Sequence, residues 1–227
     1  MRILLTLLTL ISLPSLAAGL LNDTGVTTCF DGTNMVACTG DNSGDAAAYP
    51  GQDGRYGRDA AQAAGQLPAK IGGGAEGFDF SPLDASGNAI ALTGNPPVPV
   101  ATPACVRDNV TGLIWEGKTA ANMNATYTFA GAATYAGTAN SAGLCGAHSG
   151  WRVPTARELM SIVHWGTSGP SIDKNYFPNT ISFWYFSSDV YAPDPVEAWG
   201  VSFDDGGLGH ASQNFEGVHG RLVRSGQ

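Results

Sequence analysis

Residues 151–159 read Trp-Arg-Val-Pro-Thr-Ala-Arg-Glu-Leu, and this stretch predicts the beginning of a helix. Thr155 and, three residues later, Glu158 match a capping box, in which each side chain accepts a hydrogen bond from the backbone N–H of the other residue. The apolar residues that follow recur at helical spacing and would form one buried stripe: Leu159, Ile162 and Val163. We expect the helix to end at Gly166. The stretch therefore predicts a short helix that packs one side against a core.

Strand patterns surround this helix. Upstream, residues 110–115 combine β-branched and aromatic residues, and residues 129–142 form a weaker helix candidate that two glycines dilute. Downstream, four segments are typical of strands: 183–188, 198–203, 208–214 and 220–224. Between the second and third, residues 204–207 are Asp-Asp-Gly-Gly, so these two strands would form a hairpin. The pattern predicts an α+β fold with an antiparallel sheet and one or two helices.

The composition limits the classes of partner. The chain has 227 residues, of which 13% are charged, and it contains 31 glycines. Such low charge and high glycine content exclude a coiled coil or a charged helical bundle and favour a turn-rich fold. The net charge of -8 and the absence of basic runs argue against nucleic acid, because phosphate contacts need clustered Lys and Arg. Neutral ligands and divalent cations remain compatible with this composition.

The first 18 residues have the features of a secretory signal peptide. Arg2 provides a positive charge, residues 3–13 form an apolar run, and Pro14 and small residues precede the expected cleavage site. The apolar run is too short to cross a bilayer, and no later stretch is apolar and long enough to do so. We therefore expect residues 1–18 to be removed. The mature chain is predicted to be secreted, periplasmic or on the cell surface, with no membrane span.

The remaining chain divides into two parts of different composition. Residues 19–104 form a Gly- and Asp-rich N-terminal extension with a few short strand candidates: 26–30, 35–38, 77–83 and 89–92. Residues 96–99, Pro-Pro-Val-Pro, are typical of an extended linker. Residues 105–227 carry the denser helix and strand patterns and form the predicted domain. Because the strands of the extension are short and few, we expect it to pack on the core of that domain.

Four cysteines are spread along the chain: Cys29, Cys38, Cys105 and Cys145. An even number in an exported chain predicts two disulfides, and four cysteines allow three pairings. Cys29 and Cys38 flank a predicted hairpin, which favours their pairing and leaves Cys105 to pair with Cys145. A zinc site or a catalytic thiol is the less favoured alternative, because the sequence has no C-x-x-C and no histidine at zinc-ligand spacing.

Several short motifs resemble those of a known family. The nonapeptide at 151–159 is preceded by residues 111–115, Thr-Gly-Leu-Ile-Trp, and followed by residues 172–180, Ile-Asp-Lys-Asn-Tyr-Phe-Pro-Asn-Thr. Further motifs follow in order: Ser187-Ser188, Ala198-Trp199 and Arg221-Leu222-Val223-Arg224. In this order they resemble the Lcl C-terminal domain family, which is named for a bacterial collagen-like adhesin. The resemblance covers residues 105–227.

The resemblance implies a C-type-lectin-like fold, related to that of the sulfatase-modifying enzymes, in an exported bacterial protein. For the adhesin-type members of the family it also implies binding to a surface polysaccharide. The family has no agreed catalytic residues, so a non-enzymatic module is expected. The motif residues are expected to be structural: Trp115, Trp151, Arg152, Pro154, Glu158, Trp199 and Arg221. We expect the tryptophans, together with Trp184, to lie in the core. We expect Arg152 to bind backbone carbonyls or a carboxylate beneath the sheet, and binding of an acidic ligand is the less favoured alternative.

The loops of the C-terminal sheet are the predicted ligand surface, because aromatic and polar side chains there can stack on sugar rings and bind their hydroxyls. The candidate ligand-binding residues are Tyr185, Tyr191, Asp194, Asp204, His210 and Asn214. Asp204 and Asp205 form an adjacent carboxylate pair that could bind Ca²⁺, although Asp and Gly also favour a plain turn. No other cofactor is expected.

The predicted function is that of an exported, adhesin-like module that recognises an extracellular polysaccharide or another surface polymer. An envelope- or pilus-associated module that binds a surface protein is the first alternative. An enzyme on the sulfatase-modifying scaffold is the second alternative. That scaffold uses a reactive cysteine pair, whereas the four cysteines here are assigned to disulfides.

Overall fold

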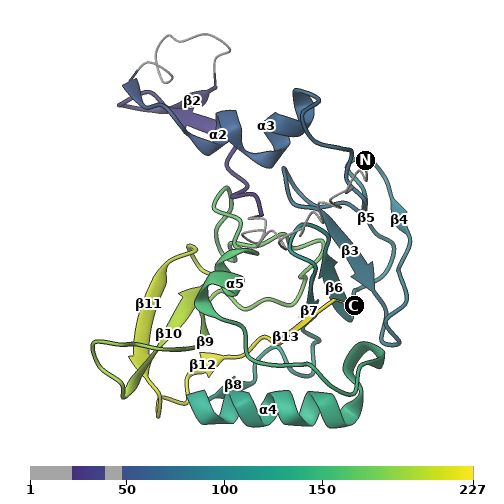
Figure 1. Ribbon diagram of the computed structural model, residues 1–227, viewed down its shortest axis with the longest axis vertical. Coiled ribbons are helices and arrows are strands. Elements are labelled where there is room, and N and C mark those ends of the chain that lie inside the picture. The colour runs from purple at the N-terminus through teal and green to yellow at the C-terminus, as the bar shows by residue number, and fades with distance from the viewer. Residues whose placement is uncertain (1–21, 39–47, 227) are drawn as a thin grey trace, which may run out of the picture.

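The computed structural model describes residues 22–38 and 48–226, in which two main sheets and several helices pack around a shared core (Figure 1). The predicted signal peptide, residues 1–18, lies outside the described residues. Within the described ranges, no helix is both long enough and apolar enough to cross a membrane. The architecture is α+β, as the sequence predicts.

The larger sheet has five strands in the order β11-β10-β9-β12-β8. Their bounds are Thr126–Tyr127 for β8, Trp184–Val190 for β9, Glu197–Ser202 for β10, Leu208–Ser212 for β11 and Val218–His219 for β12. All neighbours are antiparallel except β12 and β9, which meet in parallel. Strands β10 and β11 form the predicted hairpin, and β11 is an edge strand of this sheet.

The smaller sheet has four antiparallel strands in the order β13-β7-β6-β3. Their bounds are Phe80–Leu83 for β3, Cys105–Asp108 for β6, Leu113–Glu116 for β7 and Val223–Ser225 for β13. Strand β7 begins later than predicted, because the Asp108 carboxylate accepts hydrogen bonds from the backbone N–H groups of Val110, at 2.9 Å, and Thr111, at 3.3 Å. These bonds hold the preceding residues in a turn, which Gly112 completes at a φ of 74°.

The predicted extension, residues 19–104, contributes directly to the four-stranded sheet. Its strand β3 pairs with β6, and the buried Phe78 and Phe80 belong to the main hydrophobic core. The boundary near residue 104 therefore falls inside one sheet. Residues 96–99 are not a linker: they form a turn and strand β5 (Val98–Pro99), which pairs with β4 (Leu92–Thr93). A two-stranded ribbon tolerates Pro99 because its outer side needs no backbone donor.

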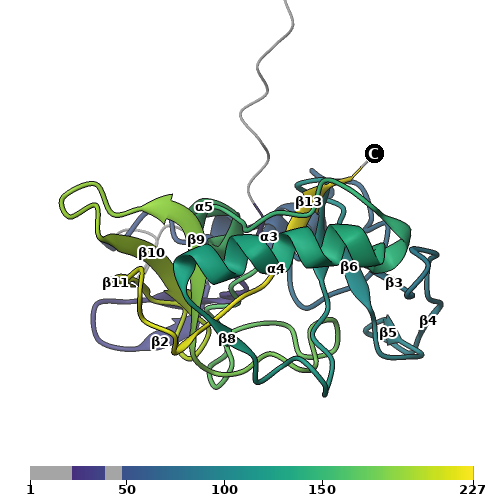
Figure 2. The same ribbon diagram turned by 90° about the horizontal axis from the view of Figure 1, so that it is seen from below.

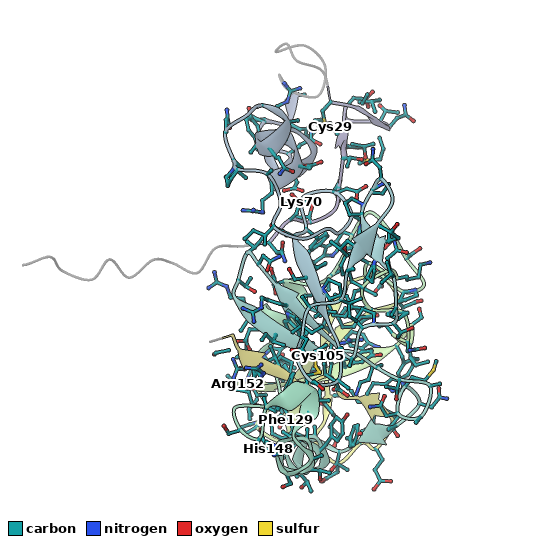
Figure 3. The ribbon with its side chains drawn as sticks, turned by 90° about the vertical axis from the view of Figure 1, so that its right-hand side faces the viewer. Cys29, Lys70, Cys105, Phe129, His148 and Arg152 are labelled. Carbon is teal, nitrogen blue, oxygen red and sulfur yellow. A yellow bond between two sulfur atoms is a disulfide. The ribbon has the colours of Figure 1, made fainter. Side chains whose placement is uncertain are left out.

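The first part of the described chain forms a small lobe at one end of the molecule (Figures 1 and 3). Strands β1 (Thr28–Phe30) and β2 (Met35–Ala37) make a hairpin, which the Cys29–Cys38 disulfide closes. Two helices that the sequence analysis missed pack beside it: α2 (Asp53–Tyr56) and α3 (Arg58–Ala63). Neither contains a buried residue, so both lack the apolar periodicity that predicts a helix.

Helix α4 (Phe129–Ala142) has the predicted bounds. The Thr128 hydroxyl accepts a hydrogen bond from the backbone N–H of Gly131 at 3.0 Å, and Gly143 ends the helix in the left-handed conformation. Its buried residues are all alanines: Ala132, Ala136 and Ala139. Because the side chains on this buried face are small, the helix lies close against both sheets, and Figure 2 shows it running across them. A 3-10 turn, Leu144–Gly146, follows it.

Helix α5 (Ala156–Met160) begins with the predicted capping box, in which Thr155 and Glu158 exchange both hydrogen bonds. It ends before Ser161, so the predicted end at Gly166 is wrong. The Ser161 hydroxyl donates a hydrogen bond to the Glu158 carbonyl at 2.7 Å. This bond gives a carbonyl of the last helical turn a partner, so the helix can end there. The apolar residues of the stripe are buried even beyond the helix: Leu159, Ile162 and Val163.

The last predicted strand, residues 220–224, is only partly confirmed, because residues 220–222 lie in no strand and only Val223 and Arg224 belong to β13. Strand β12 belongs to the five-stranded sheet and β13 to the four-stranded sheet, and Arg221 lies between them. Its guanidinium is fully buried and donates to the Glu116 backbone carbonyl at 2.8 Å and to the Thr180 hydroxyl at 2.6 Å. The Phe177 ring centre lies 5.1 Å from this cation. A buried, hydrogen-bonded arginine therefore marks the passage of the chain from one sheet to the other.

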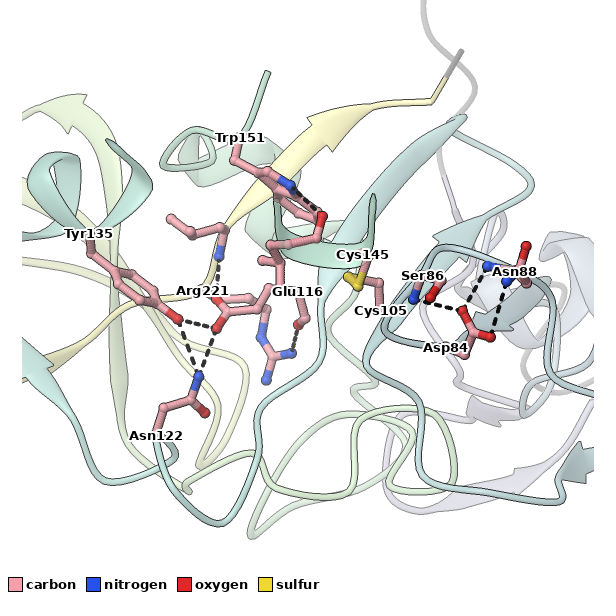
Figure 4. Close-up of a disulfide and its surroundings, with 12 residues drawn as sticks. Asp84, Ser86, Asn88, Cys105, Glu116, Asn122, Tyr135, Cys145, Trp151 and Arg221 are labelled. Atoms are coloured by element: carbon pink, nitrogen blue, oxygen red, sulfur yellow. Dashed lines mark hydrogen bonds between the residues drawn. A yellow bond between two sulfur atoms is a disulfide. The ribbon is translucent and has the colours of Figure 1, made fainter. Parts of the chain in front are cut away.

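The carboxylate of Glu116, which is only 1% exposed, joins the sheets to helix α4 (Figure 4). One oxygen accepts hydrogen bonds from the Lys118 ammonium at 2.9 Å, from the Asn122 amide at 3.2 Å and from the Tyr135 phenol. The other accepts the backbone N–H of Leu222 at 3.0 Å. Burial lowers the pKa of Lys118, and the Glu116 carboxylate partly offsets this shift. Burial raises the pKa of Tyr135, and the Glu116 carboxylate raises it further. The phenol therefore stays protonated and remains a donor.

The second disulfide, Cys105–Cys145, joins β6 to the turn that follows α4 (Figure 4). Trp151 packs over this region and donates its indole N–H to the Leu144 carbonyl at 3.1 Å. Both disulfides have the pairing that the sequence favours, and all four cysteines are therefore oxidised.

Substitution of Glu116 by Ala should destabilise the fold strongly. It leaves the buried Lys118 ammonium and the Leu222 N–H without their partner, and breaking a buried ion pair costs about 3–5 kcal/mol. Arg152→Ala, which removes an exposed ion pair with Glu158, should cost about 0–1 kcal/mol. Urea unfolding of both variants measures the two losses. Equal and small losses would show that Glu116 does not organise the core.

The stability of the fold should depend on pH through His219. This side chain is 7% exposed, and burial lowers its pKa below the usual value of 6.5. The unfolded chain therefore binds a proton more readily than the folded chain, so stability is lost as the pH falls from about 6.5 toward the lower folded-state pKa. Urea unfolding at pH 7.5 and 5.5 measures the loss, and His219→Gln should reduce it. An unchanged pH dependence in the variant would contradict this assignment.

Candidate functional site

Family motifs meet where helix α5 joins the five-stranded sheet. The register between β9 and β10 shifts around Trp199, where β9 carries extra residues in a bulge. The Asp189 carboxylate of β9 accepts the backbone N–H of Ala156 in the first turn of α5 at 2.8 Å. The backbone N–H of Ser188 donates to the Pro154 carbonyl at 2.7 Å. These bonds fix α5 beside β9 and hold Trp199 near the edge of the sheet.

Three rings form an edge cluster on one face of strands β10 and β11: Tyr191, Trp199 and His210. The Tyr191 and His210 rings are parallel, with centroids 3.9 Å apart, and Trp199 lies edge-on to both. The Nδ1 atom of His210 makes a hydrogen bond with the Glu197 carboxylate. Because this bond fixes the imidazole, the cluster presents a rigid aromatic surface to solvent.

A groove of about 590 Å³, here called the α5 groove, lies between α5, residues 22–24 and strands β9–β11. Its apolar lining residues are Met160, Trp165, Val190, Trp199 and Leu208. Trp165, Val190 and Leu208 are 38%, 44% and 46% exposed. Contiguous exposed apolar side chains in a groove are typical of ligand-binding or interaction surfaces.

The charged residues of the α5 groove differ in their partners. Asp189 is held by the first turn of α5, and Asp23 accepts the backbone N–H groups of Gly25, at 2.8 Å, and Arg58, at 2.6 Å. The guanidinium of Arg157 is exposed and makes no hydrogen bond or ion pair within residues 22–38 and 48–226. Arg157 is therefore able to turn toward a ligand in the groove.

Tyr185 was expected on the ligand surface, but it is a core residue with 0% exposure. Its hydroxyl accepts the backbone N–H of Ile181 at 3.0 Å, and its ring packs against Phe203 and His219. The prediction is wrong because Tyr185 pairs with Val201 on the side of β9 that faces the main core.

The other predicted ligand residues do not form one surface. Tyr191 and His210 lie together in the edge cluster. Asp194 and Asn214 are exposed in turns at the same end of the β10–β11 hairpin. Asp204 lies at the opposite end, where its carboxylate accepts the Ser182 hydroxyl at 2.5 Å.

The sequence analysis missed Trp165, Val190 and Leu208, which line the α5 groove. Trp165 closely follows a buried stripe, and Leu208 begins a strand, so each has the sequence context of a core residue. The alternation of β11 was an available signal, because Leu208 lies two residues from His210 and shares its face.

The motif tryptophans have two different environments. Trp115 and Trp151 are buried, as predicted, with 0% and 3% exposure. Trp184 and Trp199 are only half-buried, so the prediction of core positions is wrong for these two. Both lie on strands near the β11 edge, where each face of the sheet is hollowed by a pocket.

Arg152 pairs with a carboxylate, but at the surface rather than beneath the sheet. Its guanidinium makes two hydrogen bonds to Glu158, at 2.7 and 2.6 Å, and the Arg152 side chain is 43% exposed. Glu158 also completes the capping box with Thr155. Arg152 therefore stabilises the start of α5, while Pro154 is buried beside it.

Asp204 and Asp205, the predicted calcium ligands, lie in the β10–β11 turn. The Asp205 carboxylate accepts the backbone N–H of Gly207 at 3.0 Å, and this hydrogen bond lowers the pKa of the carboxyl. Among the residues that the structure describes, no three His, Cys, Asp or Glu side chains gather in a metal-binding arrangement. The Asp205 carboxylate therefore closes the turn, and the Asp204 carboxylate ties the turn to Ser182.

Millimolar Ca²⁺ should therefore change the melting temperature by less than about 2 °C, which corresponds to less than about 1 kcal/mol of binding-linked stability. Differential scanning fluorimetry with CaCl₂ and with EGTA measures this shift. A rise of more than about 5 °C that disappears in the double variant Asp204→Asn and Asp205→Asn would instead establish a calcium site in the turn.

A family model described as the Lcl C-terminal domain matches residues 104–224, which is more than half of the chain. The match runs from the residue before β6 into β13 and so includes α5, the edge cluster and most of the α5 groove. No curated protein and no solved structure matches the chain. The C-type-lectin-like relationship therefore stays a prediction. The chain belongs to the Lcl C-terminal domain family.

Proposed function

We propose that this chain is an exported, adhesin-like binding module that recognises an extracellular polysaccharide in the α5 groove. Membership of a family named for an adhesin supports a role at the cell surface. The two disulfides support export, because such bonds persist in oxidising compartments. On this proposal residues 1–18 direct export and are removed, and the mature chain acts in the periplasm, on the cell surface or outside the cell.

The observation that carries the proposal is the aromatic lining of the α5 groove. Trp165 is 38% exposed, and Trp199 is held at the groove by the edge cluster. The apolar face of a sugar ring can stack on such an indole, and this contact removes exposed apolar surface from water. A groove of about 590 Å³ has room for more than one sugar ring, as recognition of a polymer requires.

Polar groups beside the aromatic rings can form hydrogen bonds with the hydroxyls of a sugar. Arg157 offers guanidinium donors, and the exposed backbone of edge strand β11 offers further hydrogen-bonding groups. Hydroxyl-rich ligands need such groups, because an unpaired hydroxyl in an apolar groove would be unfavourable. The combination favours a carbohydrate over a purely apolar ligand.

We propose binding rather than catalysis for this site. All four cysteines are in disulfides, which leaves no thiol for the cysteine chemistry of the sulfatase-modifying scaffold. Free-thiol titration of the native protein tests this directly: no reactive thiol is expected, and one reactive thiol per chain would revive the enzyme hypothesis.

The proposed function is tested with purified mature chain on an array of immobilised bacterial and host polysaccharides, with and without Ca²⁺. We expect binding to at least one polysaccharide. Trp165→Ala and Trp199→Ala should each weaken it at least about fivefold, which corresponds to about 1 kcal/mol of lost stacking. Tyr56→Ala, which removes an exposed aromatic side chain from the N-terminal lobe, is the matched control and should bind normally.

Two results would contradict the proposal. Binding to no polysaccharide above background would exclude a carbohydrate ligand of the classes on the array. Binding that both tryptophan variants retain would place the carbohydrate site outside the α5 groove. Capture of one defined envelope protein through the α5 groove, in place of a polysaccharide, would favour the protein-interaction alternative.

A further inference from the structure

A second hollow lies on the opposite face of the five-stranded sheet. Trp199 and its partner His210 carry the edge cluster on one face, so the residues that alternate with them point to the other face. These residues are small and line a pocket of about 280 Å³: Ala198, Gly200, Gly209 and Ala211. We call this pocket the Trp184 slot, because Trp184 forms one of its walls.

The indole of Trp184 lies directly over the two glycines of the slot. A Cβ atom placed on Gly209 would meet the indole Cη2 at 2.7 Å, and one on Gly200 would meet Cε3 at 3.7 Å. The indole therefore spans β10 and β11, and Gly209 is required for its position. Larger side chains at these positions would fill the slot.

Phe215 also lines the slot and is 52% exposed. Its ring folds back over Gly217, where an added Cβ atom would meet the ring at 2.5 Å. The turn that carries it is closed by a hydrogen bond from the backbone N–H of Phe215 to the Ser212 carbonyl at 3.0 Å. The turn and the close approach to Gly217 thus fix the position of the phenyl ring, although about half of the Phe215 side chain is exposed to solvent.

Polar side chains flank this exposed ring. Asn214 and Glu216, on either side of Phe215, are exposed. Within the described part of the chain, neither side chain makes a hydrogen bond or an ion pair. The polar side chain that lines the slot itself is His210. Two aromatic residues, this imidazole and the polar neighbours of Phe215 match the two sides of a sugar ring, which has apolar C–H faces and hydroxyls at its edge.

We propose that the Trp184 slot is a second carbohydrate-binding site, which takes a single pyranose ring between Trp184 and Phe215. The volume limits the ligand to one ring, because about 280 Å³ is below the roughly 300–1,000 Å³ of pockets for drug-sized ligands. The inference rests on the proposed function only in the choice of carbohydrate as the ligand class.

The α5 groove and the Trp184 slot lie on the two faces of the same edge. Only strands β10 and β11 separate them, and β11 is the outermost strand. A polysaccharide that passes around this edge can therefore place rings in both sites at once. Occupation of both sites would strengthen binding of long polymers relative to short fragments, because the second contact becomes intramolecular.

The slot is tested by NMR titration of the full mature chain, labelled with ¹⁵N, with the methyl glycosides of glucose, galactose, mannose and N-acetylglucosamine. At least one glycoside should shift the Trp184 indole N–H resonance in a saturable manner. Phe215→Ala and Gly209→Ala should each raise the dissociation constant at least about fivefold. Phe183→Ala is the control, because this residue is also exposed (43%) and does not line the slot.

The Trp115 indole resonance reports whether each variant is folded, since Trp115 is fully buried in the core. No shift of Trp184 with any glycoside would overturn the inference. A shift with p-cresol alone would also overturn it, because the slot would then take an aromatic side chain of a protein. Shifts at Trp184 without polymer binding in the α5 groove would refute the proposed function while leaving the slot assigned, and the reverse result would refute only the slot.

Discussion

The buried carboxylate of Glu116 is the interaction on which the arrangement of the two sheets depends. It lies at the end of β7 and takes hydrogen bonds from Lys118, from Tyr135 of helix α4 and from the backbone of Leu222. An ion that is removed from water is tolerated only where its partners replace the lost hydration. The folded chain meets this condition by bringing together three segments that are distant in sequence: the end of β7 with Lys118, helix α4 and the residues just before β13.

Arg221 extends the same constraint to the five-stranded sheet. It binds the backbone carbonyl of Glu116 and separates β12 from β13, so the final segment of the chain contributes to both sheets. This crossing fixes the inner strands of the five-stranded sheet and leaves β11 at its edge. The α5 groove and the Trp184 slot then occupy the two faces of that edge, where aromatic side chains are half-buried instead of packed in the core.

Local signals made much of this fold predictable. The capping box at Thr155 and Glu158 identified the start of α5, and alternation identified β10. Features set by distant contacts were not predictable: the end of α5, the passage of the chain from one sheet to the other between β12 and β13, and the burial of Tyr185. The candidate site was predicted only in part for the same reason, since Trp165 and Leu208 have the local pattern of core residues and tertiary packing alone leaves them exposed.

The central claim is that the aromatic α5 groove binds a polysaccharide. A crystal structure of the mature chain with an oligosaccharide fragment of the polysaccharide selected on the array tests this claim most directly. The account predicts sugar rings in contact with Trp165 and Trp199, between α5 and β11. Sugar bound elsewhere, such as against α4 or on the N-terminal lobe, with the α5 groove empty, would contradict it.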